Sequence, residues 1–329
     1  MDKEQIRDVR KTKNRSRKVL ILLLGFVLGG FAAIIAYVIR HPGIKGHPMS
    51  IAEVGSEKIY FDADPGMAQL GHENFMLYVP TAYVVIGEYP TWELFKISAN
   101  VPKNNYNWET DFTVPAGGLY YNYFENGEGE AKGRVAIDVS EFQKSIDWAK
   151  VKGAGIDVAI VRVGYRGYGQ GKIVDDALYQ QNLQGAQDNG IATGVYFFSQ
   201  AINADEGVEE ANYVLEKIKG YNVTEPIIID TEEVEDPEGR GNKSTVEART
   251  DGIVAFCETI EAAGYTPMIY ASRNWFVKDL DIDRIGKYEF WLACYDTPVF
   301  PYHAEGYQYT PSGYVDGIPT QVDLDVWMR

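Results

Sequence analysis

The feature that most constrains the fold is an alternation of strand-like and helix-like segments that begins near residue 134. Short apolar runs typical of strands recur eight times, at residues 135–139, 158–164, 193–199, 227–230, 267–271, 290–295, 306–309 and 322–327. Between several of these runs, apolar residues recur with helical spacing, as Val208, Ala211 and Leu215 do. Such alternation predicts a parallel sheet covered by helices, and eight strands suggest that the sheet closes into a barrel.

The helical segments carry recognisable ends. Ser244 and Glu247 have the spacing of a capping box, ahead of an apolar helical stripe that stops at Gly264. The connections between the last strands, in contrast, leave little room for helices. The sequence therefore predicts an α/β fold for residues 131–329: an irregular (β/α) barrel, TIM-like but abbreviated in its second half.

The most informative motif lies at residues 226–233, where an apolar run ends with two carboxylates two residues apart. A short unbroken β-branched run predicts a strand buried on both faces. Because side chains alternate along a strand, Asp230 and Glu232 should share one face at the carboxyl end, where barrels carry their active sites. Crowded carboxylates raise each other's proton affinity, so one can donate a proton near neutral pH while the other stays ionised. Such a pair is suited to acid-assisted cleavage of an acetal.

Further polar and aromatic residues lie at the ends of the predicted strands and should converge on the same mouth. They are Asp138, Tyr165, Tyr196, Phe198, Tyr270, Trp291, Tyr295, Gln308, Asp323 and Asp325. Acids beside flat aromatic rings suit a carbohydrate site, because rings cover the apolar faces of sugars and carboxylates bind their hydroxyls. Single members also have simpler explanations: Tyr196 can fill the barrel interior, Asp138 can cap a turn, and Asp323 can be a surface acid.

Several motifs, taken in order, resemble glycoside hydrolase family 25, the lysozymes that cleave bacterial peptidoglycan. The first is RVAIDVSEFQ at residues 134–143, with IDW at 146–148. They are followed by GVYFF at 194–198, IIDTE at 228–232, FWLACY at 290–295, QYT at 308–310 and GIPTQVDLD at 317–325. The resemblance covers about residues 133–329 and does not reach residues 1–130.

This resemblance implies an N-acetylmuramidase, which hydrolyses the β-1,4 bond between N-acetylmuramic acid and N-acetylglucosamine in peptidoglycan glycan strands. By position, it makes Glu232 the general acid and later the base that activates water, with Asp230 as its partner. Asp138 and Asp323 would complete the acidic floor of the site. We expect the other residues of the mouth to bind the substrate: Tyr165, Tyr196, Trp291, Tyr295, Gln308 and Asp325.

The spacing of the acid pair favours one mechanism. Residues i and i+2 of a strand have Cα atoms about 6.6 Å apart and side chains that leave in the same direction. Such neighbours are poorly placed to flank a glycosidic bond from opposite sides, as an inverting glycosidase requires. We therefore expect the substrate's own 2-acetamido oxygen to attack the anomeric carbon, with Asp230 orienting the acetamido group and net retention of configuration.

The amino-terminal region predicts a membrane anchor. The first 18 residues hold eight Lys or Arg and three acids, and residues 19–39 contain no charge. Such a segment is long enough to cross a bilayer as a helix, and the preceding positive charge places the amino terminus in the cytoplasm. A signal peptide is the alternative, but its apolar core should be shorter and followed by small residues. We expect a basic cytoplasmic arm at 1–18, a transmembrane helix at 19–39, and a catalytic domain outside the cell.

Charge and residue usage exclude several other classes of function. Residues after the basic arm include 23 basic and 44 acidic side chains, a formal charge of −21, which opposes nucleic-acid binding. The four His, at 41, 47, 72 and 303, lack the spacing of a zinc site, so we expect no metal or cofactor. The two cysteines, Cys257 and Cys294, are compatible with buried thiols or with a disulfide.

The sequence of residues 40–130 predicts a small β-rich module or, alternatively, an ordered extension packed on the main domain. Strand-like runs flank Pro80-Thr81, and a Gly-rich polar stretch at 125–130 suggests a boundary. This region is a candidate docking site for a partner in the cell-envelope machinery. The main alternative to an enzyme is a non-catalytic peptidoglycan-binding or scaffold protein of a secretion or conjugation machine. The presence of both Asp230 and Glu232 favours the enzyme, since a binding protein needs no proton donor.

Overall fold

The computed structural model describes residues 49–54, 57–62, 67–72, 75–80, 83–86, 93–108, 110–295 and 300–329. The chain divides into two compact units, Met1–Ile97 and Ser98–Arg329. In the described part of the first unit, strands pair as antiparallel hairpins: β1 (Met49–Val54) with β2 (Glu57–Asp62), β3 (Met67–His72) with β4 (Phe75–Pro80), and β5 (Tyr83–Ile86) with β6 (Glu93–Lys96). The strands expected on either side of Pro80-Thr81 are thus present, but each pairs with another neighbour.

In the part of the chain that the structure describes, no helix combines the length and the hydrophobicity that crossing a bilayer requires. The predicted basic arm at 1–18 and the predicted transmembrane helix at 19–39 lie outside the described residues.

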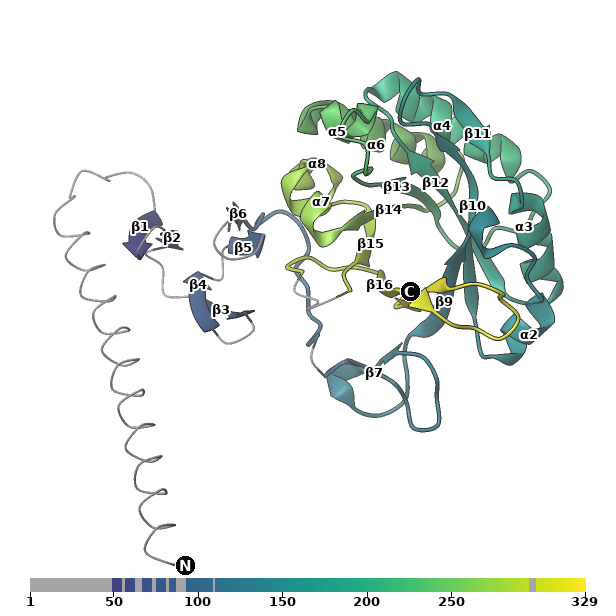
Figure 1. Ribbon diagram of the computed structural model, residues 1–329, viewed down its shortest axis with the longest axis horizontal. Helices are drawn as coiled ribbons and strands as arrows, with labels where there is room; N and C mark the ends of the chain where they lie inside the picture. Colours follow the sequence, from purple (N-terminus) through teal and green to yellow (C-terminus); the bar gives the residue numbers. More distant parts are fainter. Residues whose placement is uncertain are drawn as a thin grey trace, which may run out of the picture. The chain divides into compact units, whose positions relative to one another are not determined.

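The second unit is built on a closed eight-stranded barrel (Figure 1). Its strands, in order around the barrel, are β9 (Arg134–Val139), β10 (Val158–Arg166), β12 (Ala192–Ser199), β13 (Ile227–Thr231), β14 (Pro267–Ser272), β15 (Glu289–Ala293), β16 (Gly306–Gly313) and β17 (Val322–Trp327). Pairing of β9 with both β10 and β17 closes the ring. A short strand, β11 (Ile173–Asp175), adds antiparallel to β10.

The closed barrel of eight strands confirms the sequence prediction, but the expected TIM-like architecture is wrong. A TIM barrel has eight parallel strands, each followed by a helix. Here β9 to β16 run parallel, whereas β17 is antiparallel to both of its neighbours, β16 and β9. An antiparallel neighbour can be reached through a hairpin, so this part of the barrel needs no crossover helix.

Helices cover the outside of the parallel strands (Figure 1). They are α2 (Trp148–Gly153), α3 (Tyr179–Asp188), α4 (Ala204–Lys217), α5 (Arg240–Lys243), α6 (Val246–Ala262), α7 (Arg273–Lys278) and α8 (Ile282–Ile285). The expected cap of α6 is displaced by one residue, because Thr245 rather than Ser244 accepts the hydrogen bond from Ala248 N. The apolar stripe of this helix was predicted correctly, since Ile253, Phe256 and Ile260 are buried.

Large apolar side chains fill the lower part of the barrel interior. Ile160, Ile228, Met268, Trp291 and Trp327 form one buried cluster with Ala136 and Tyr270. Protein interiors are close-packed, so this cluster forms a solid floor rather than a channel. The polar residues that line a cavity lie at the end of the barrel above this floor, where the parallel strands have their carboxyl ends.

Residues 98–130 cover the part of the barrel that has no crossover helix. Their hairpin of β7 (Phe112–Thr113) and β8 (Asn122–Tyr123) contacts β17 and β9. The ring of Trp108 packs 5.1 Å from that of Tyr307 on β16, and Asn104 N donates to Pro301 O. This segment is thus an ordered extension of the barrel unit. A catalytic domain that begins at residue 131 stays a prediction.

Candidate active site

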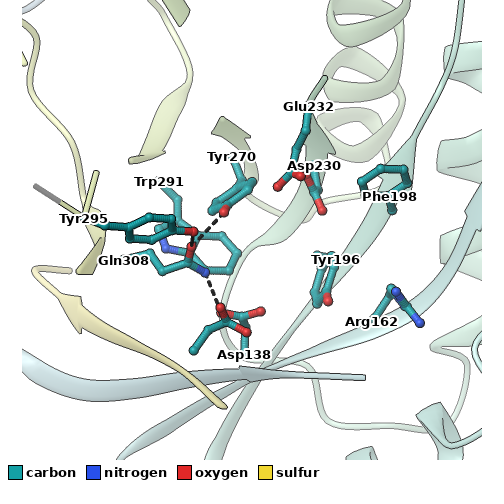
Figure 2. A pocket seen from close by; sticks show the side chains of 11 residues that line it. Asp138, Arg162, Tyr196, Phe198, Asp230, Glu232, Tyr270, Trp291, Tyr295 and Gln308 are labelled. Atoms are coloured by element: carbon teal, nitrogen blue, oxygen red, sulfur yellow. Dashed lines mark hydrogen bonds between the residues drawn. The ribbon is translucent and has the colours of Figure 1, made fainter. Parts of the chain in front are cut away.

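A cavity of about 300 Å³ opens above the apolar floor of the barrel (Figure 2). Its lining residues come from all eight barrel strands and from the segments that follow β13 and β15: Asp138, Arg162, Tyr196, Phe198, Asp230, Glu232, Tyr270, Trp291, Tyr295, Gln308 and Asp323. Eight of the ten residues expected from the sequence are therefore brought together. Four of the lining groups are carboxyls, and Arg162 is the cation among them.

The acid pair follows from the alternation of side chains along β13. Asp230 is 5 % exposed and faces the cavity, and Glu232, just past the end of the strand, faces the same way (Figure 2). Thr231 points in the opposite direction, where its hydroxyl accepts a hydrogen bond of 3.0 Å from Trp275 Nε1. The strand is buried along its full length, which fixes this register and with it the direction of both carboxyls.

Burial raises the pKa of both carboxyls of the pair. The pKa of Glu232 is raised to about 6, mainly by burial, while a hydrogen bond from Tyr270 works against the increase. The pKa of Asp230 is raised well above its ordinary value, first by burial and then by the negative charge of Glu232. The pair therefore holds a proton in mildly acidic solution, where ordinary carboxyls have lost theirs.

Two more acids meet where the first and last barrel strands pair. Asp138 on β9 lies directly opposite Asp323 on β17 in the antiparallel register. Burial raises the pKa of Asp323 to about 6. Burial also raises the pKa of Asp138, and the negative charges of Asp323 and Asp325 raise it further. These carboxyls form an acidic wall beside the pair on β13.

Gln308 fixes the orientation of three groups around this wall. Its Oε1 accepts hydrogen bonds from the hydroxyls of Tyr270, at 2.7 Å, and Tyr295, at 2.6 Å. Its amide nitrogen is consequently turned toward Asp138 and donates to Oδ2 at 2.8 Å. Because an ionised carboxylate only accepts hydrogen bonds, Asp138 takes the NH₂ end of the amide, and the carbonyl end is left to accept from the two tyrosine hydroxyls.

Comparison with known proteins assigns the chain to a family. The family model described as glycosyl hydrolases family 25 matches residues 137–318, more than half of the chain. The chain belongs to glycosyl hydrolases family 25. The matched region begins in β9 and includes every lining residue of the cavity except Asp323.

Relatives in family 25 include proteins named lysozymes. The autolytic lysozyme of Clostridium acetobutylicum is 24 % identical over 191 residues, covering 57 % of this chain and 54 % of that protein. Lysozyme M1 of Streptomyces globisporus is 32 % identical over 109 residues, covering 32 % of this chain and 35 % of that protein. The chain thus spans about half the length, or less, of these two curated relatives.

The fold is also similar to that of a solved structure. The modular autolysin LytC from Streptococcus pneumoniae, in complex with a synthetic peptidoglycan ligand, aligns with a TM-score of 0.54 and 24 % identity. The alignment covers 84 % of this chain and 66 % of that chain. At this level of identity the match supports the fold alone.

Two residues expected in the family 25 site lie outside the cavity. Tyr165 on β10 is three residues beyond Arg162, about 10 Å farther along the strand, and its ring lies 5.5 Å from the Arg162 guanidinium. Asp325 is fully buried beneath the cavity, where it accepts a 2.9 Å hydrogen bond from Trp291 Nε1. Asp325 was expected at the mouth, but because β17 is antiparallel its amino end, with Asp323, lies there instead.

Arg162 is a cavity residue that sequence reasoning missed. Its Nε donates to Asp176 Oδ2 at 2.9 Å, and its guanidinium stacks 4.9 Å from the ring centroid of Phe142. A signal was present, since Arg162 is the one charged side chain in the apolar run at residues 158–164. A charge on a buried strand requires a partner, and such residues are often functional.

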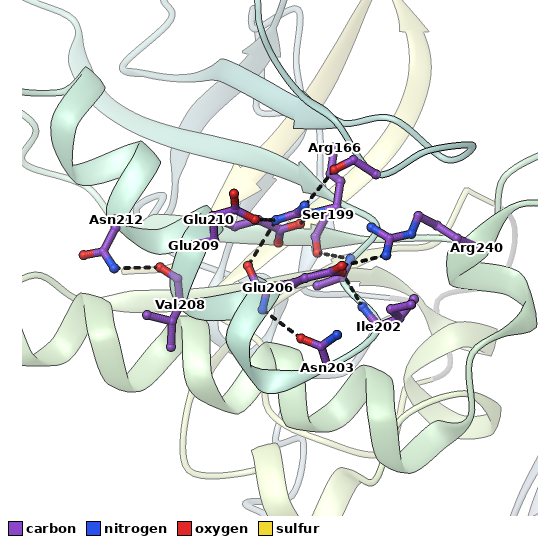
Figure 3. A network of polar contacts seen from close by, with 12 residues as sticks. Arg166, Ser199, Ile202, Asn203, Glu206, Val208, Glu209, Glu210, Asn212 and Arg240 are labelled. Carbon is purple, nitrogen blue, oxygen red and sulfur yellow. Dashed lines mark hydrogen bonds and ion pairs between the residues drawn. The ribbon is translucent and has the colours of Figure 1, made fainter.

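A second group of charged residues links α4 to β10 and α5 (Figure 3). Arg166, at the end of β10, donates to Glu210 Oε1 at 2.6 Å and to Glu209 Oε2 at 2.7 Å, both on α4. Arg240 of α5 donates to Glu206 Oε1 at 2.6 Å, also on α4. These contacts attach the first turns of α4 to β10 and to the loop that follows Glu232.

The acids of the cavity are not arranged as metal ligands. In the described part of the chain, no group of three or more His, Cys, Asp or Glu side chains could hold a metal ion.

Proposed function

We propose that this family 25 protein is a muramidase that hydrolyses the β-1,4 bond between N-acetylmuramic acid and N-acetylglucosamine in peptidoglycan. The observation that carries the proposal is the buried pair of Asp230 and Glu232 in an acidic cavity at the mouth of the barrel. The lysozyme relatives support the same substrate class.

In this proposal Glu232 handles the proton. With its pKa raised to about 6, it is partly protonated at neutral pH and can protonate the leaving glycosidic oxygen as the bond to the anomeric carbon breaks. Glu232 is then ionised, and it accepts a proton from the water that attacks the anomeric carbon. The proton lost in the first step is thereby regained, and the enzyme returns to its starting state.

Asp230 orients the substrate's own nucleophile in this proposal. A carboxyl oxygen of Asp230, which accepts in either protonation state, takes a hydrogen bond from the 2-acetamido N–H and so directs the acetamido oxygen at the anomeric carbon. A bond forms between that oxygen and the anomeric carbon while the glycosidic bond breaks. Water then opens the resulting ring, so two inversions give net retention. The carboxylates of Asp138 and Asp323 stabilise the positive charge that develops.

The remaining lining residues would hold the sugar rings in place. Tyr196, Trp291 and Tyr295 present aromatic surfaces to the cavity, and aromatic faces cover the apolar C–H faces of sugars. Gln308 is already aligned by two tyrosine hydroxyls, so its amide is preorganised. Tyr165 and Asp325 are not part of this proposed binding surface.

The decisive experiment is digestion of purified peptidoglycan by the full chain and by Glu232→Gln. We expect the wild type to release fragments with new reducing-end muramic acid, and the variant to lose about a hundredfold or more in rate, as loss of a general acid does. NMR should detect the β-anomer first. An inverted first product would exclude the acetamido mechanism. Binding without any cleavage by the wild type would instead favour a non-catalytic scaffold.

We also propose that residues 19–39 anchor the protein in the cell membrane, with the catalytic unit outside and residues 40–130 available to an envelope partner. The charge-free run of residues 19–39 after a basic arm supports the anchor. Protease added to intact protoplasts should remove the catalytic unit from the full chain. A catalytic unit that becomes accessible only after lysis would contradict this topology.

A further inference from the structure

We propose that Phe142 is a sugar-binding platform outside the cavity, which holds a more distant unit of the glycan strand. This inference rests on the proposed function, because it assumes a polymeric glycan substrate. Phe142 is 62 % exposed although its side chain is fully apolar. It lies in the short helix η2 (Glu141–Gln143), directly after the strand that carries Asp138.

The exposure of Phe142 is enforced by the structure of this turn. Ser140 accepts a hydrogen bond from Phe142 N, and the Gln143 side chain accepts one from Ser140 N, which completes a capping box. Gln143 is buried and donates to Gln321 O in the loop between β16 and β17. With the turn fixed at both ends and its neighbour directed inward, the ring of Phe142 is held toward solvent.

Arg162 joins this ring to the cavity. Its guanidinium lies 4.9 Å from the ring centroid of Phe142 and also lines the cavity wall. A buried carboxylate, Asp176, fixes both partners, because it accepts hydrogen bonds from Arg162 Nε and from Glu141 N. Phe142 is therefore a braced extension of the cavity wall rather than an isolated surface residue.

The cavity carries an exposed aromatic ring at each end. Tyr295 lines it on one side and is 47 % exposed, whereas Arg162, with Phe142 on its guanidinium, stands on the other side (Figure 2). A cavity of about 300 Å³ is small compared with a glycan strand, so a polymer bound across it must continue past both ends. A sugar unit leaving beside Arg162 reaches the free face of Phe142.

The charges around Phe142 favour a sugar ring over the stem peptide. Glu141 lies beside it and pairs with Arg162 at 3.4 Å, and the cavity beyond holds four carboxyls. The region is therefore acidic on balance, and the acidic groups of a stem peptide would meet like charge. A neutral sugar offers C–H bonds to the aromatic face and hydroxyls to the Glu141 carboxylate.

The test uses the full chain and peptide-free glycan strands of two lengths: long polymers, and the shortest oligomer that the wild type cleaves. We expect Phe142→Ala to lower kcat/KM on the polymer by about three- to tenfold, through KM, as loss of one stacking contact does. The short oligomer should be cleaved at the wild-type rate, and Phe142→Trp should restore cleavage of the polymer. Val208→Ala, which changes an exposed apolar residue on α4, is the matched control.

Equal effects of Phe142→Ala on both lengths, or no effect on the polymer, would overturn the proposal. So would a loss that appears only when stem peptides are present, because the platform would then bind peptide. Cosedimentation with polymeric glycan separates this result from the proposed function: Phe142→Ala should weaken binding in the inactive Glu232→Gln background as well. If the protein binds polymeric glycan in a manner that depends on Phe142 but does not cleave it, the result would contradict the proposed muramidase activity and leave the platform proposal standing.

Discussion

Glu232 illustrates how far the surroundings of one carboxyl determine the proposed chemistry. An exposed glutamic acid would be ionised at neutral pH and could not donate a proton. Burial at the mouth of the barrel raises the pKa of Glu232 to about 6 and retains a protonated fraction. The main cause of the raised pKa of Glu232 is therefore its burial at the end of β13, rather than an interaction with one particular side chain.

The rate of glycan cleavage should consequently fall as the pH rises above about 6. The acid form of Glu232 is present below its pKa and is lost as the pH passes through it. Initial rates of cleavage of a soluble oligomer, measured between pH 4 and pH 9, would show this decrease. Asp188→Asn, at an exposed position on α3, should leave the profile unchanged. A rate that stays constant up to pH 8 would contradict the assignment of Glu232 as the acid.

At the residue scale, strand alternation was sufficient to predict the acid pair but not every neighbour. Asp230 and Glu232 follow from a buried strand whose register has no alternative. Asp325 could not be placed correctly, because periodicity in a sequence shows which face a residue occupies and not the direction in which the strand runs. The exposure of Phe142 depends on a capped turn and on Arg162, which come together only in the folded chain.

At the scale of elements, α4 is attached to the barrel by charges rather than by apolar contacts alone. Glu210 is fully buried, its pKa is raised to about 7 by burial, and Arg166 is its ionic partner (Figure 3). Arg166→Met should lower the free energy of unfolding by about 3–5 kcal/mol, because it leaves a buried carboxyl without a partner. Urea unfolding at pH 8 would measure this loss.

Two controls accompany that substitution. The double variant Arg166→Met with Glu210→Leu should recover most of the stability, since neither charge then remains buried. Lys219→Met removes an exposed ion pair with Glu216 and should change the free energy of unfolding by less than about 1 kcal/mol. If the double variant is no more stable than the single one, packing rather than charge attaches α4.

The extension at residues 98–130 should be required for a stable barrel. It covers the outer face of β16, where Trp108 and Phe112 pack against Tyr307. Removal of it would expose several aromatic rings, each worth about 1.5–3 kcal/mol when buried. We expect residues 131–329 to unfold at a clearly lower urea concentration than residues 98–329. Equal urea midpoints for the two proteins would show that the extension does not stabilise the barrel.

The sequence predicted the position of most elements because buried β-branched runs have few alternatives. The run at 322–327 matches β17, and the run at 227–230 differs from β13 by one residue. The antiparallel direction of β17 was not predicted, because a short connection shows that there is little room for a helix but not in which direction the next strand runs. The packing of residues 98–130 on the barrel was expected only as the alternative to a separate module, since their aromatic residues show no regular period.

At the scale of the whole molecule, the acidic cavity should reduce the stability of the fold at neutral pH. The pKa values of Glu232 and Asp323 are both raised to about 6, from ordinary values of 4.5 and 3.8. A carboxyl whose pKa is higher in the folded than in the unfolded protein contributes its full stabilisation at pH values below the unfolded-state pKa. This contribution is lost as the pH rises through the folded-state pKa of about 6. The free energy of unfolding should therefore decrease between pH 4 and pH 7.5.

Asp323→Asn should remove part of this decrease. We expect the variant to gain about 2 kcal/mol over the wild type at pH 7.5 and much less at pH 4, where Asp323 is protonated anyway. Urea unfolding at both pH values would measure the difference, with Asp188→Asn as the exposed control. An equal gain at both pH values would show that packing, rather than ionisation, is responsible.

The pairing of β17 with β9 also bears on when the protein can become active. These strands are the last and the first of the barrel along the chain, so the ring cannot close until residues 322–327 have left the ribosome. Asp138 and Asp323 face each other across that final seam. A nascent chain thus carries its reacting acids on β13 long before the opposite wall exists, and a wall-degrading activity would be withheld until synthesis of the barrel is complete.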